Sequence, residues 1–430
     1  MNSSLNRLVL ARESTYGVAP IDFLTDPTTK KGYAVNQSSS TPADLMEDAN
    51  KVFIEETTGS QIEDGDAQTE GDYTVTASMA HNFAVNDALV LMAMLFQNDY
   101  AYTATITDGS ITAISNNVDD VTLTLTDAGT LAVLDKINIS GRADSLENGN
   151  YIVQDITGND ITIIYVGGFN DADLTGTVAA VINTHSAKIE SVGECPKQLL
   201  DSSYTLYQPK SFDKPDCSKA YGDQMTGLAL KTLNLDLYAS TYSAELNGHQ
   251  LNDGIENVPK DDTQYKPVLV GNSIYYPVNR PVVKIGGVTQ KAVSLTSNWT
   301  LGLDESTKTK SAGRMDSVVV DRVTGEGEWS MLFKTEDEAN NYSNTFYKGR
   351  NTAENGAVVE FGIEHKNGAS MFIGGKVKFS NEKVTKEPNG WLFSTNYKFC
   401  KDTQNGVSNI TLTCKNGYNY SLAELFRTTA

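Results

Sequence analysis

The sequence is poor in cysteine, and its four cysteines stand far apart. They are Cys195, Cys217, Cys400 and Cys414 in a chain of 430 residues, with no Cys-x-x-Cys pair among them. A disulfide-stabilised scaffold needs a denser set, and a zinc site needs Cys or His ligands at close spacing. The sequence therefore predicts free thiols and folding in a reducing compartment.

Basic residues are scarce as well. The chain has 34 Lys and Arg against 54 Asp and Glu, which gives a formal net charge of −20. A general nucleic-acid-binding surface requires a basic footprint, and an anionic membrane attracts basic segments. The charge balance therefore argues against both kinds of partner.

Long apolar runs are missing too. The longest, "ALVLMAMLF" from Ala88 to Phe96, is about half the length of a membrane-spanning helix. The first residues, "MNSSLNRLVLARESTYG", lack the apolar centre of a signal peptide. We therefore expect no membrane association.

The sequence shows no arrangement of residues that is typical of a catalytic or metal site. The histidines are isolated, at His81, His185, His249 and His365, without an HxxxH or Cys/His spacing. A Ser/His/Asp triad does not depend on sequence order, but no GxSxG motif is present. The GxG in "TGEGEWS" is expected in a hairpin turn rather than between a strand and a helix, so it does not predict phosphate binding. We predict no enzymatic activity, no metal and no cofactor.

Apolar and polar residues alternate with period two along most of the chain, which is typical of β-strands. The segments with this pattern are 73–83, 121–127, 228–240, 292–303, 327–335, 357–365 and 372–380. Trp299, Trp329 and Trp391 lie in predicted strands and are expected in the core. Helical patterns are limited to 86–96, to 334–349, where Thr335 and Glu338 form a capping box, and to 421–428. The fold class is therefore mainly β with short flanking helices.

Residues 103–183 differ from the rest, because short strands there are separated by NN, DG, NG and GN turns. We interpret them as a small β module inserted into a host domain. Around it, an acidic turn, a strand and a helix occur twice, at 68–96 and 323–349, and each set is followed by a strand pair. This pattern predicts a duplicated domain of the sandwich or barrel type. Residues 27–59 are polar and rich in turn residues, and we expect a long loop there that orders against a partner.

The predicted domains follow from these patterns. The first host domain comprises 1–102 plus 184–255, the inserted module 103–183, the second host domain 256–404 and a C-terminal tail 405–430.

The segment "IEDGDAQTEGDY" at 62–73 carries carboxylates at even spacing, so an extended strand would place them on one face. They are Asp64, Asp66, Glu70 and Asp72. A calcium loop would need Gly at its sixth position and Glu at its twelfth; Thr69 and Val75 stand there. The pattern favours an electrostatic or structural face over a calcium site.

The order of these elements resembles the tail tube protein (the major tail protein) of a long-tailed bacteriophage. The segment "VFIEETTGSQIEDGDAQTEGDYTVTASMAHNFAVNDALVLMAMLF" has the family's sequence of a Glu-Thr segment, an acidic turn, a strand and a small helix. Gln61 stands where an Arg is common in the family, so an ion pair between rings made by that Arg is in doubt here. The second half, from "AVSLTSNWTLGL" to "WSMLFKTED", is similar to the second copy of tube proteins with a duplicated domain, and the insert resembles small β modules of phage virions.

The resemblance implies a structural virion protein that assembles in the host cytoplasm into stacked rings around a DNA channel. Two tube domains per chain imply trimeric rings with pseudo-sixfold symmetry, with hexameric rings as the alternative. Partners would be further copies, the tail terminator, the tape measure and baseplate or tail-tip proteins. DNA would pass without specific binding, because carboxylates repel it within a Debye length of roughly 8–10 Å. The lumen-facing candidates are Asp64, Asp66, Glu70 and Asp72, with Glu326 and Glu328 in the second half.

Two other interpretations stay open from the sequence. One is a β-rich adhesin, tail decoration or carbohydrate-binding protein that uses Tyr and Trp for stacking. The other is a tail-associated glycosidase, which would need two carboxylates roughly 5–9 Å apart in a cleft.

Overall fold

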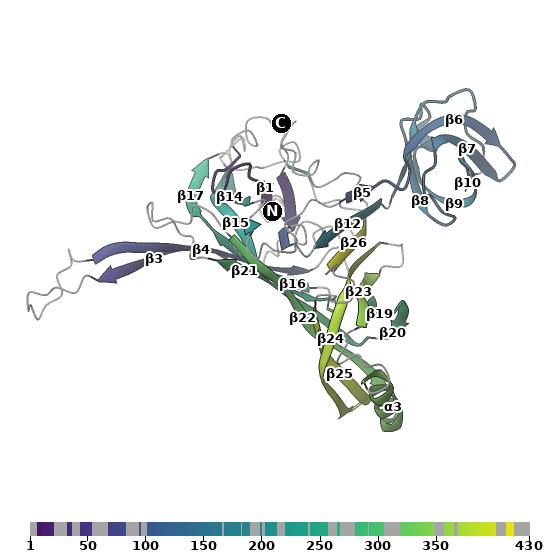
Figure 1. The fold of residues 1–430 in the computed structure, drawn as a ribbon. Helices are drawn as coiled ribbons and strands as arrows, with labels where there is room; N and C mark the ends of the chain where they lie inside the picture. The colour runs from purple at the N-terminus through teal and green to yellow at the C-terminus, as the bar shows by residue number, and fades with distance from the viewer. Residues whose placement is uncertain are drawn as a thin grey trace, which may run out of the picture.

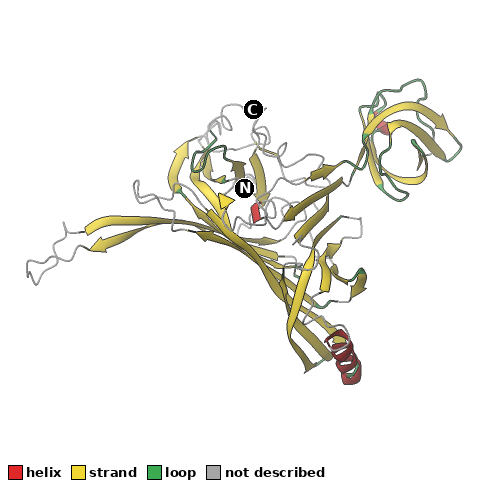
Figure 2. Ribbon diagram, in the orientation of Figure 1, coloured by secondary structure: helices red, strands yellow, loops and turns green. Residues whose placement is uncertain are grey.

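The computed structural model confirms a mainly β protein built from antiparallel sheets with few helices (Figure 2). It describes residues 7–20, 32–36, 44–53, 68–82, 94–95, 101–165, 167–181, 183–189, 198–199, 203–212, 220–239, 241–256, 265–266, 280–290, 292–304, 319–347, 357–364, 369–400 and 410–416.

The centre of the molecule is a sheet of eight strands that crosses both halves of the chain (Figure 1). Each strand is antiparallel to its neighbour. We call it the central sheet. In spatial order its strands are β3 (Asp44–Phe53), β4 (Gln68–Asn82), β16 (Thr241–Gly248), β15 (Ala220–Asp236), β21 (Ser294–Asp304), β22 (Val319–Phe333), β25 (Gly390–Phe399) and β24 (Ser370–Glu387).

Two strands of the central sheet are long enough to enter a second layer. The first part of β15 pairs with β14 (Tyr204–Phe212) and β17 (Gln250–Glu256), β14 pairs with β1 (Arg7–Arg12), and β1 pairs with β2 (Gly32–Asn36). The first part of β24 pairs with β23 (Ala357–Glu364) and β26 (Ile410–Asn416), β23 pairs with β19 (Arg280–Ile285), and β19 pairs with β20 (Val288–Gln290).

The pairing of the first half therefore recurs in the second. In chain order, β1, β2, β3, β4, β14, β15, β16 and β17 correspond to β19, β20, β21, β22, β23, β24, β25 and β26. Every ladder within the first set has an antiparallel counterpart within the second. One further ladder, between β15 and β21, joins the two sets into the single central sheet.

A helix follows the fourth strand of the second set. It is α3 (Glu336–Tyr347), and the predicted capping box is confirmed at its start. The backbone N–H of Glu338 donates to Oγ1 of Thr335 at 3.3 Å, and the N–H of Thr335 donates to Oε2 of Glu338 at 3.4 Å. In the first set, the helical residues Met94 and Leu95 follow β4 and are fully buried. The rest of the predicted helix at 86–96, and the predicted helix at 421–428, lie outside the described residues.

The main core lies between the two layers, and two of the three tryptophans confirm their expected place in it. Trp299 and Trp329 have no exposed surface, whereas Trp391 is half-buried. The sequence analysis expected the GxG of "TGEGEWS" in a hairpin turn, and this prediction is wrong. The two glycines lie in the middle of β22. A Cβ at Gly325 would clash with the ring of Trp299, and a Cβ at Gly327 would clash with the carbonyl oxygen of Thr296. Both glycines are therefore required by packing.

The segment between β5 (Ala101–Thr103) and β12 (Asn183–Ile189) forms a closed six-stranded barrel with its own core. Figure 1 shows it standing away from the central sheet. Thr103 of β5 lies opposite Thr184 of β12, so the chain enters and leaves the barrel on two paired strands. In order around the barrel, the strands are β10 (Asp160–Ile164), β7 (Asp120–Asp127), β6 (Asp108–Asn116), β11 (Thr177–Ala180), β8 (Lys136–Ser140) and β9 (Gly149–Thr157).

Two regions that the sequence analysis expected outside the sheets contain strands. The predicted loop at 27–59 contains β2 and β3, and β3 forms a long hairpin ribbon with β4 that extends from the body (Figure 1). The predicted tail at 405–430 contains β26, which pairs with both β24 and β12. The remaining short strands are β13 (Gln198–Leu199), paired with β22, and β18 (Tyr265–Lys266), parallel to β2. In both regions, backbone hydrogen bonds to neighbouring strands stabilise a strand that the local sequence does not indicate.

Candidate assembly surface

One face of the central sheet carries mostly polar and charged side chains and lies away from the core. The strand registers align a continuous row across seven strands of this face. The row consists of Lys378, Lys398, Glu326, Asn298, Asn234, Ser243 and Ala80. The alternating residues on the same strands, such as Leu233, Ala244 and Trp299, are buried in the core. We call this surface the polar face.

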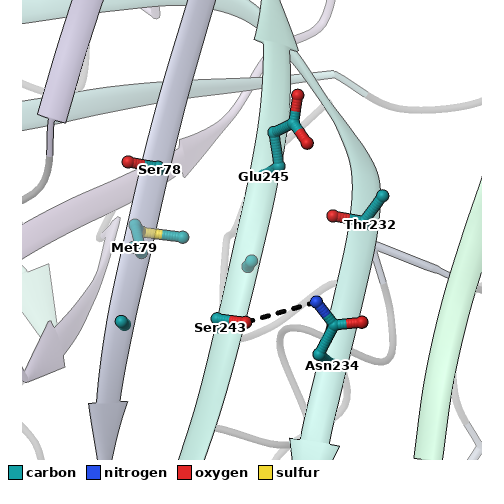
Figure 3. A pocket seen from close by; sticks show the side chains of 8 residues that line it. Ser78, Met79, Thr232, Asn234, Ser243 and Glu245 are labelled. Carbon is teal, nitrogen blue, oxygen red and sulfur yellow. Dashed lines mark hydrogen bonds between the residues drawn. The ribbon is translucent and has the colours of Figure 1, made fainter.

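A shallow hollow of about 430 Å³ lies on the polar face where β4, β16 and β15 run side by side (Figure 3). Its lining includes Ser78, Thr232, Asn234, Ser243 and Glu245. The amide Nδ2 of Asn234 donates to Oγ of Ser243 at 3.3 Å. The lining combines hydroxyl and amide groups with Met79, Ala80 and Ala244, and its one carboxylate, Glu245, is paired with Lys231, so the hollow can hold water but offers no acid–base pair for catalysis.

Two lysines of the polar face lie beside carboxylates. Nζ of Lys231 is 2.9 Å from Oε1 of Glu245, and Nζ of Lys398 is 3.6 Å from Oε2 of Glu326. These pairs are largely exposed, so each contributes little to stability. They do reduce the positive charge that the surface could present to a polyanion.

The structure places the predicted acidic candidates in two separate locations. Glu326 and Glu328 are exposed on β22, where the backbone N–H of Glu328 donates to Oγ1 of Thr296 at 3.1 Å. Glu70 and Asp72 lie on the far part of β4, in the β3–β4 ribbon, and three strands separate β4 from β22. Asp64 and Asp66 lie outside the described residues. The sheet therefore does not bring the two groups together.

The central sheet ends in two strand edges, which the sequence analysis did not identify. Among the described strands, β3 forms a ladder with β4 alone, and β17 approaches it without pairing. At the opposite end, Lys383–Glu387 of β24 pairs with β25, and no described strand pairs with its other side. In the recurring pattern, β3 corresponds to β21, and this part of β24 corresponds to the second part of β15. The strands β21 and β15 pair with each other inside the chain. Edge pairing is non-local, so no sequence pattern signals it.

A Cys/His/Asn group lies elsewhere, in the second layer. His185 on β12 is opposite Cys414 on β26, and Nδ2 of Asn416 is 3.4 Å from the Cys414 sulfur. A nucleophilic thiol requires a low pKa and access to substrate. Here burial raises the pKa of the fully buried Cys414 thiol well above its usual value. The Cys414 thiol is therefore neutral and packed in the core, and the Cys/His/Asn group does not provide a nucleophile.

Within the described part of the chain, no three His, Cys, Asp or Glu residues are grouped so that they could hold a metal ion. No helix in that part is both long and apolar enough to cross a membrane.

No family model matches the chain, and no curated protein matches it. What the structure defines is the class, a mainly β protein with a recurring set of antiparallel strands and an inserted barrel.

Proposed function

We propose that this protein is a structural subunit that assembles edge to edge into rings, which stack into the tail tube of a long-tailed bacteriophage. One observation carries the proposal. The two strand sets join through β15 and β21, and the counterparts of those edges, β24 and β3, are the two ends of the central sheet. The chain thus already contains one copy of a contact that a neighbouring chain could repeat.

The recurrence predicts the register of that contact. When the two strand sets are aligned, Val75 and Met79 of β4 correspond to Gly325 and Trp329 of β22. All four residues are buried, so the core-facing positions of the two strands coincide. Through the ladders, 44–48 of β3 then corresponds to 296–300 of β21, and 383–385 of β24 corresponds to 234–236 of β15. Because Asn234 lies opposite Asn298, Met46 should lie opposite Lys383 of the next chain.

The charges at the two edges support pairing between unlike edges. β3 contains Asp44, Glu47 and Asp48 against one Lys51, whereas Lys383–Glu387 of β24 contains Lys383 and Lys386 against one Glu387, so the first edge is net acidic and the second is net basic. Surfaces of opposite net charge attract each other, and two copies of the same edge repel each other. Lysines on an edge also oppose pairing of that edge with itself.

Ring closure follows from repeated contacts of this kind. A heterologous contact forms a closed ring where its rotation permits and leaves no sheet edge exposed. With two strand sets per chain, three chains would supply six similar wedges. Rings of six whole chains are the alternative, in which the second strand set would not line the channel.

The polar face is the surface that we assign to the channel. Its small hydroxyl and amide side chains hold water, and Lys231 and Lys398 lie beside carboxylates. Fewer cations for phosphate binding mean weaker retention of DNA. The exposed Glu326 and Glu328 add repulsion at β22. The barrel, which stands apart in Figure 1, would lie outside the tube.

The proposed location is therefore the virion tail, after assembly in the host cytoplasm. Tail terminator, tape measure and baseplate or tail-tip proteins would be the partners at the ends and inside the tube. DNA would pass without specific binding.

Negative-stain microscopy of the purified full chain tests the proposal. Rings or tubes with a central channel are expected once the protein is concentrated. Particles that stay monomeric at every concentration would contradict the proposal. Monomers that bind glycans would instead favour the adhesin interpretation.

A further inference from the structure

The inserted barrel has two unlike ends. Its six strands are all antiparallel to their neighbours, so successive connections along the chain alternate between the two ends. The chain enters and leaves the barrel at one end, next to β5 and β12. The connections at the opposite end are 117–119, 141–148 and, in its described part, 167–176. We call these three connections the distal loops, and the barrel that carries them stands away from the central sheet (Figure 1).

Buried polar contacts hold the distal loops together. The side chain of Arg142 is fully buried, and its Nη2 is 2.6 Å from Oε2 of Glu147. The same Nη2 donates to the carbonyl of Asn170 at 3.0 Å, and the N–H of Asn170 donates to Oε1 of Glu147 at 2.6 Å. The side chain of Asn116 connects the first loop to the third through two hydrogen bonds of 2.8 Å with the backbone of Phe169. The relative positions of the three loops are therefore fixed before any partner binds.

Each distal loop exposes one large apolar side chain. Val118 is 87% exposed, Leu146 is 75% exposed and Leu174 is 46% exposed. Turns normally carry Gly, Asn, Asp or Ser, and an exposed apolar side chain adds little to the core of the barrel. Single exposed apolar residues are normal on a surface, but one on each of three mutually fixed loops is typical of an interaction site. Contact with a partner would explain them, whereas the folding of the barrel does not.

The exposed charges of the distal loops are all negative. Asp119, Asp144 and Asp171 are exposed. Arg142 is the only basic residue in these loops, and its side chain is buried. The one lysine of the barrel, Lys136, begins β8 at the opposite end. A partner must therefore combine apolar anchors with positive charge.

We propose that the distal loops form a docking surface for a basic amphipathic segment of another protein. Leucine or isoleucine side chains of that segment would cover Val118, Leu146 and Leu174, and its Lys or Arg side chains would meet the three exposed aspartates. A second copy of the barrel fits poorly, because two acidic ends repel each other. An anionic membrane and a nucleic acid are disfavoured for the same reason. The inference does not rest on the tail-tube proposal, since a single chain presents the same loops.

The test uses the full chain and a labelled helical peptide with Leu on one face and Lys on the other, at physiological ionic strength. Fluorescence anisotropy should show saturable binding, and the same peptide with Glu in place of Lys should not bind. Leu146→Asn and Val118→Asn should each weaken binding about tenfold or more, as expected for apolar anchors. Asp171→Asn should weaken binding less and should reduce its dependence on salt.

Two matched control variants and one mapping measurement locate the contact. Val358→Asn replaces a side chain that is 62% exposed on β23, and Asp155→Asn removes an exposed carboxylate from the wall of the barrel on β9. Both variants should bind the peptide as the unsubstituted chain does. Bound peptide should also slow hydrogen exchange in the distal loops.

Four outcomes would overturn the proposal. The first is no binding by the unsubstituted chain, and the second is binding by the loop variants that equals binding by the controls. Slowed exchange confined to the central sheet would show that the peptide binds elsewhere. Self-association of the unsubstituted chain that Leu146→Asn abolishes would favour a second copy as the partner.

Discussion

Gly325 and Gly327 show how single residues position the centre of the second strand set. Gly325 leaves room for the ring of Trp299, and Gly327 lets β22 approach Thr296, whose carbonyl accepts from the Tyr397 hydroxyl at 2.6 Å. Burial raises the pKa of Tyr397 above its usual value, so that hydroxyl stays a donor. The polar face on the other side of β22 depends on this packing.

Gly325→Ala should therefore destabilise the protein. Overpacking of a rigid core costs about 1–3 kcal/mol, because the Trp299 ring must move. The measurement is the shift of the tryptophan-fluorescence unfolding transition in urea. Asn298→Ala, on the exposed face of the neighbouring strand, is the control and should shift it little. An unchanged transition in Gly325→Ala would show that the ring repacks freely.

Asp173 gives the barrel a dependence on pH. Hydrogen bonds from the Thr175 side chain and backbone, with one from the Ala143 N–H, lower the pKa of Asp173 to about 2. Because the folded pKa lies below the usual 3.8, this contribution is present above about pH 4 and is lost as pH falls towards 2. Protection of the 167–176 amides against hydrogen exchange, measured relative to the intrinsic exchange rate at each pH, should therefore fall over that range. Asp173→Asn should already exchange faster at pH 5 and depend less on pH, and equal profiles would contradict the assignment.

At the scale of elements, the strand edges are the features that decide assembly. The β3–β24 contact predicts a disulfide between Met46→Cys on one chain and Lys383→Cys on another. Facing positions in an antiparallel pair bring Cα atoms to roughly 4.5–5.5 Å, within disulfide range. A mixture of the two single variants should give a covalent dimer on a non-reducing gel after mild oxidation.

The controls for this cross-link are each variant alone and the unsubstituted chain, which keeps the native cysteines. A mixture of Met46→Cys with Val358→Cys should also stay unlinked, because Val358 lies in the second layer. Rings without any cross-link would refute the edge assignment and leave the structural role intact. Absence of rings would contradict the structural role itself.

The barrel should be removable without loss of assembly. Thr103 and Thr184 are opposite each other on β5 and β12, so a short Asn-Gly turn can replace residues 104–183. We expect rings that have lost only the outer density, because the barrel has a separate hydrophobic core. Microscopy of the deletion variant measures this. Insoluble or unfolded protein would show that the central sheet depends on the barrel.

The strands that sequence could predict are those with local signals. Alternation at Val75, Ala77 and Met79 identified β4, and Thr335 with Glu338 identified the start of α3. The strand β3 was missed because its "DLMEDANKVF" mixes charges with apolar residues, and its order comes from pairing with β4. The edges of β3 and β24 could not be predicted, since an edge is defined by strands distant in sequence. The acidic residues were identified, but not their separation across the sheet.

At the scale of the whole molecule, the two strand sets determine the expected symmetry. The single chain joins its sets through β15 and β21, and the same contact between chains would close a ring from three chains. Such a ring has exact threefold and approximate sixfold symmetry. Each chain carries one barrel, inserted between β4 and β14 of the first set and anchored through β12 to β26 of the second, so it should mark every second wedge on the outside.

Image averaging of assembled rings by electron cryomicroscopy tests the proposed ring most directly. We expect three chains per ring, six similar wedges around the channel, the polar face towards the lumen and three barrels outside. Six whole chains per ring, or a channel lined by another surface than the polar face, would contradict it.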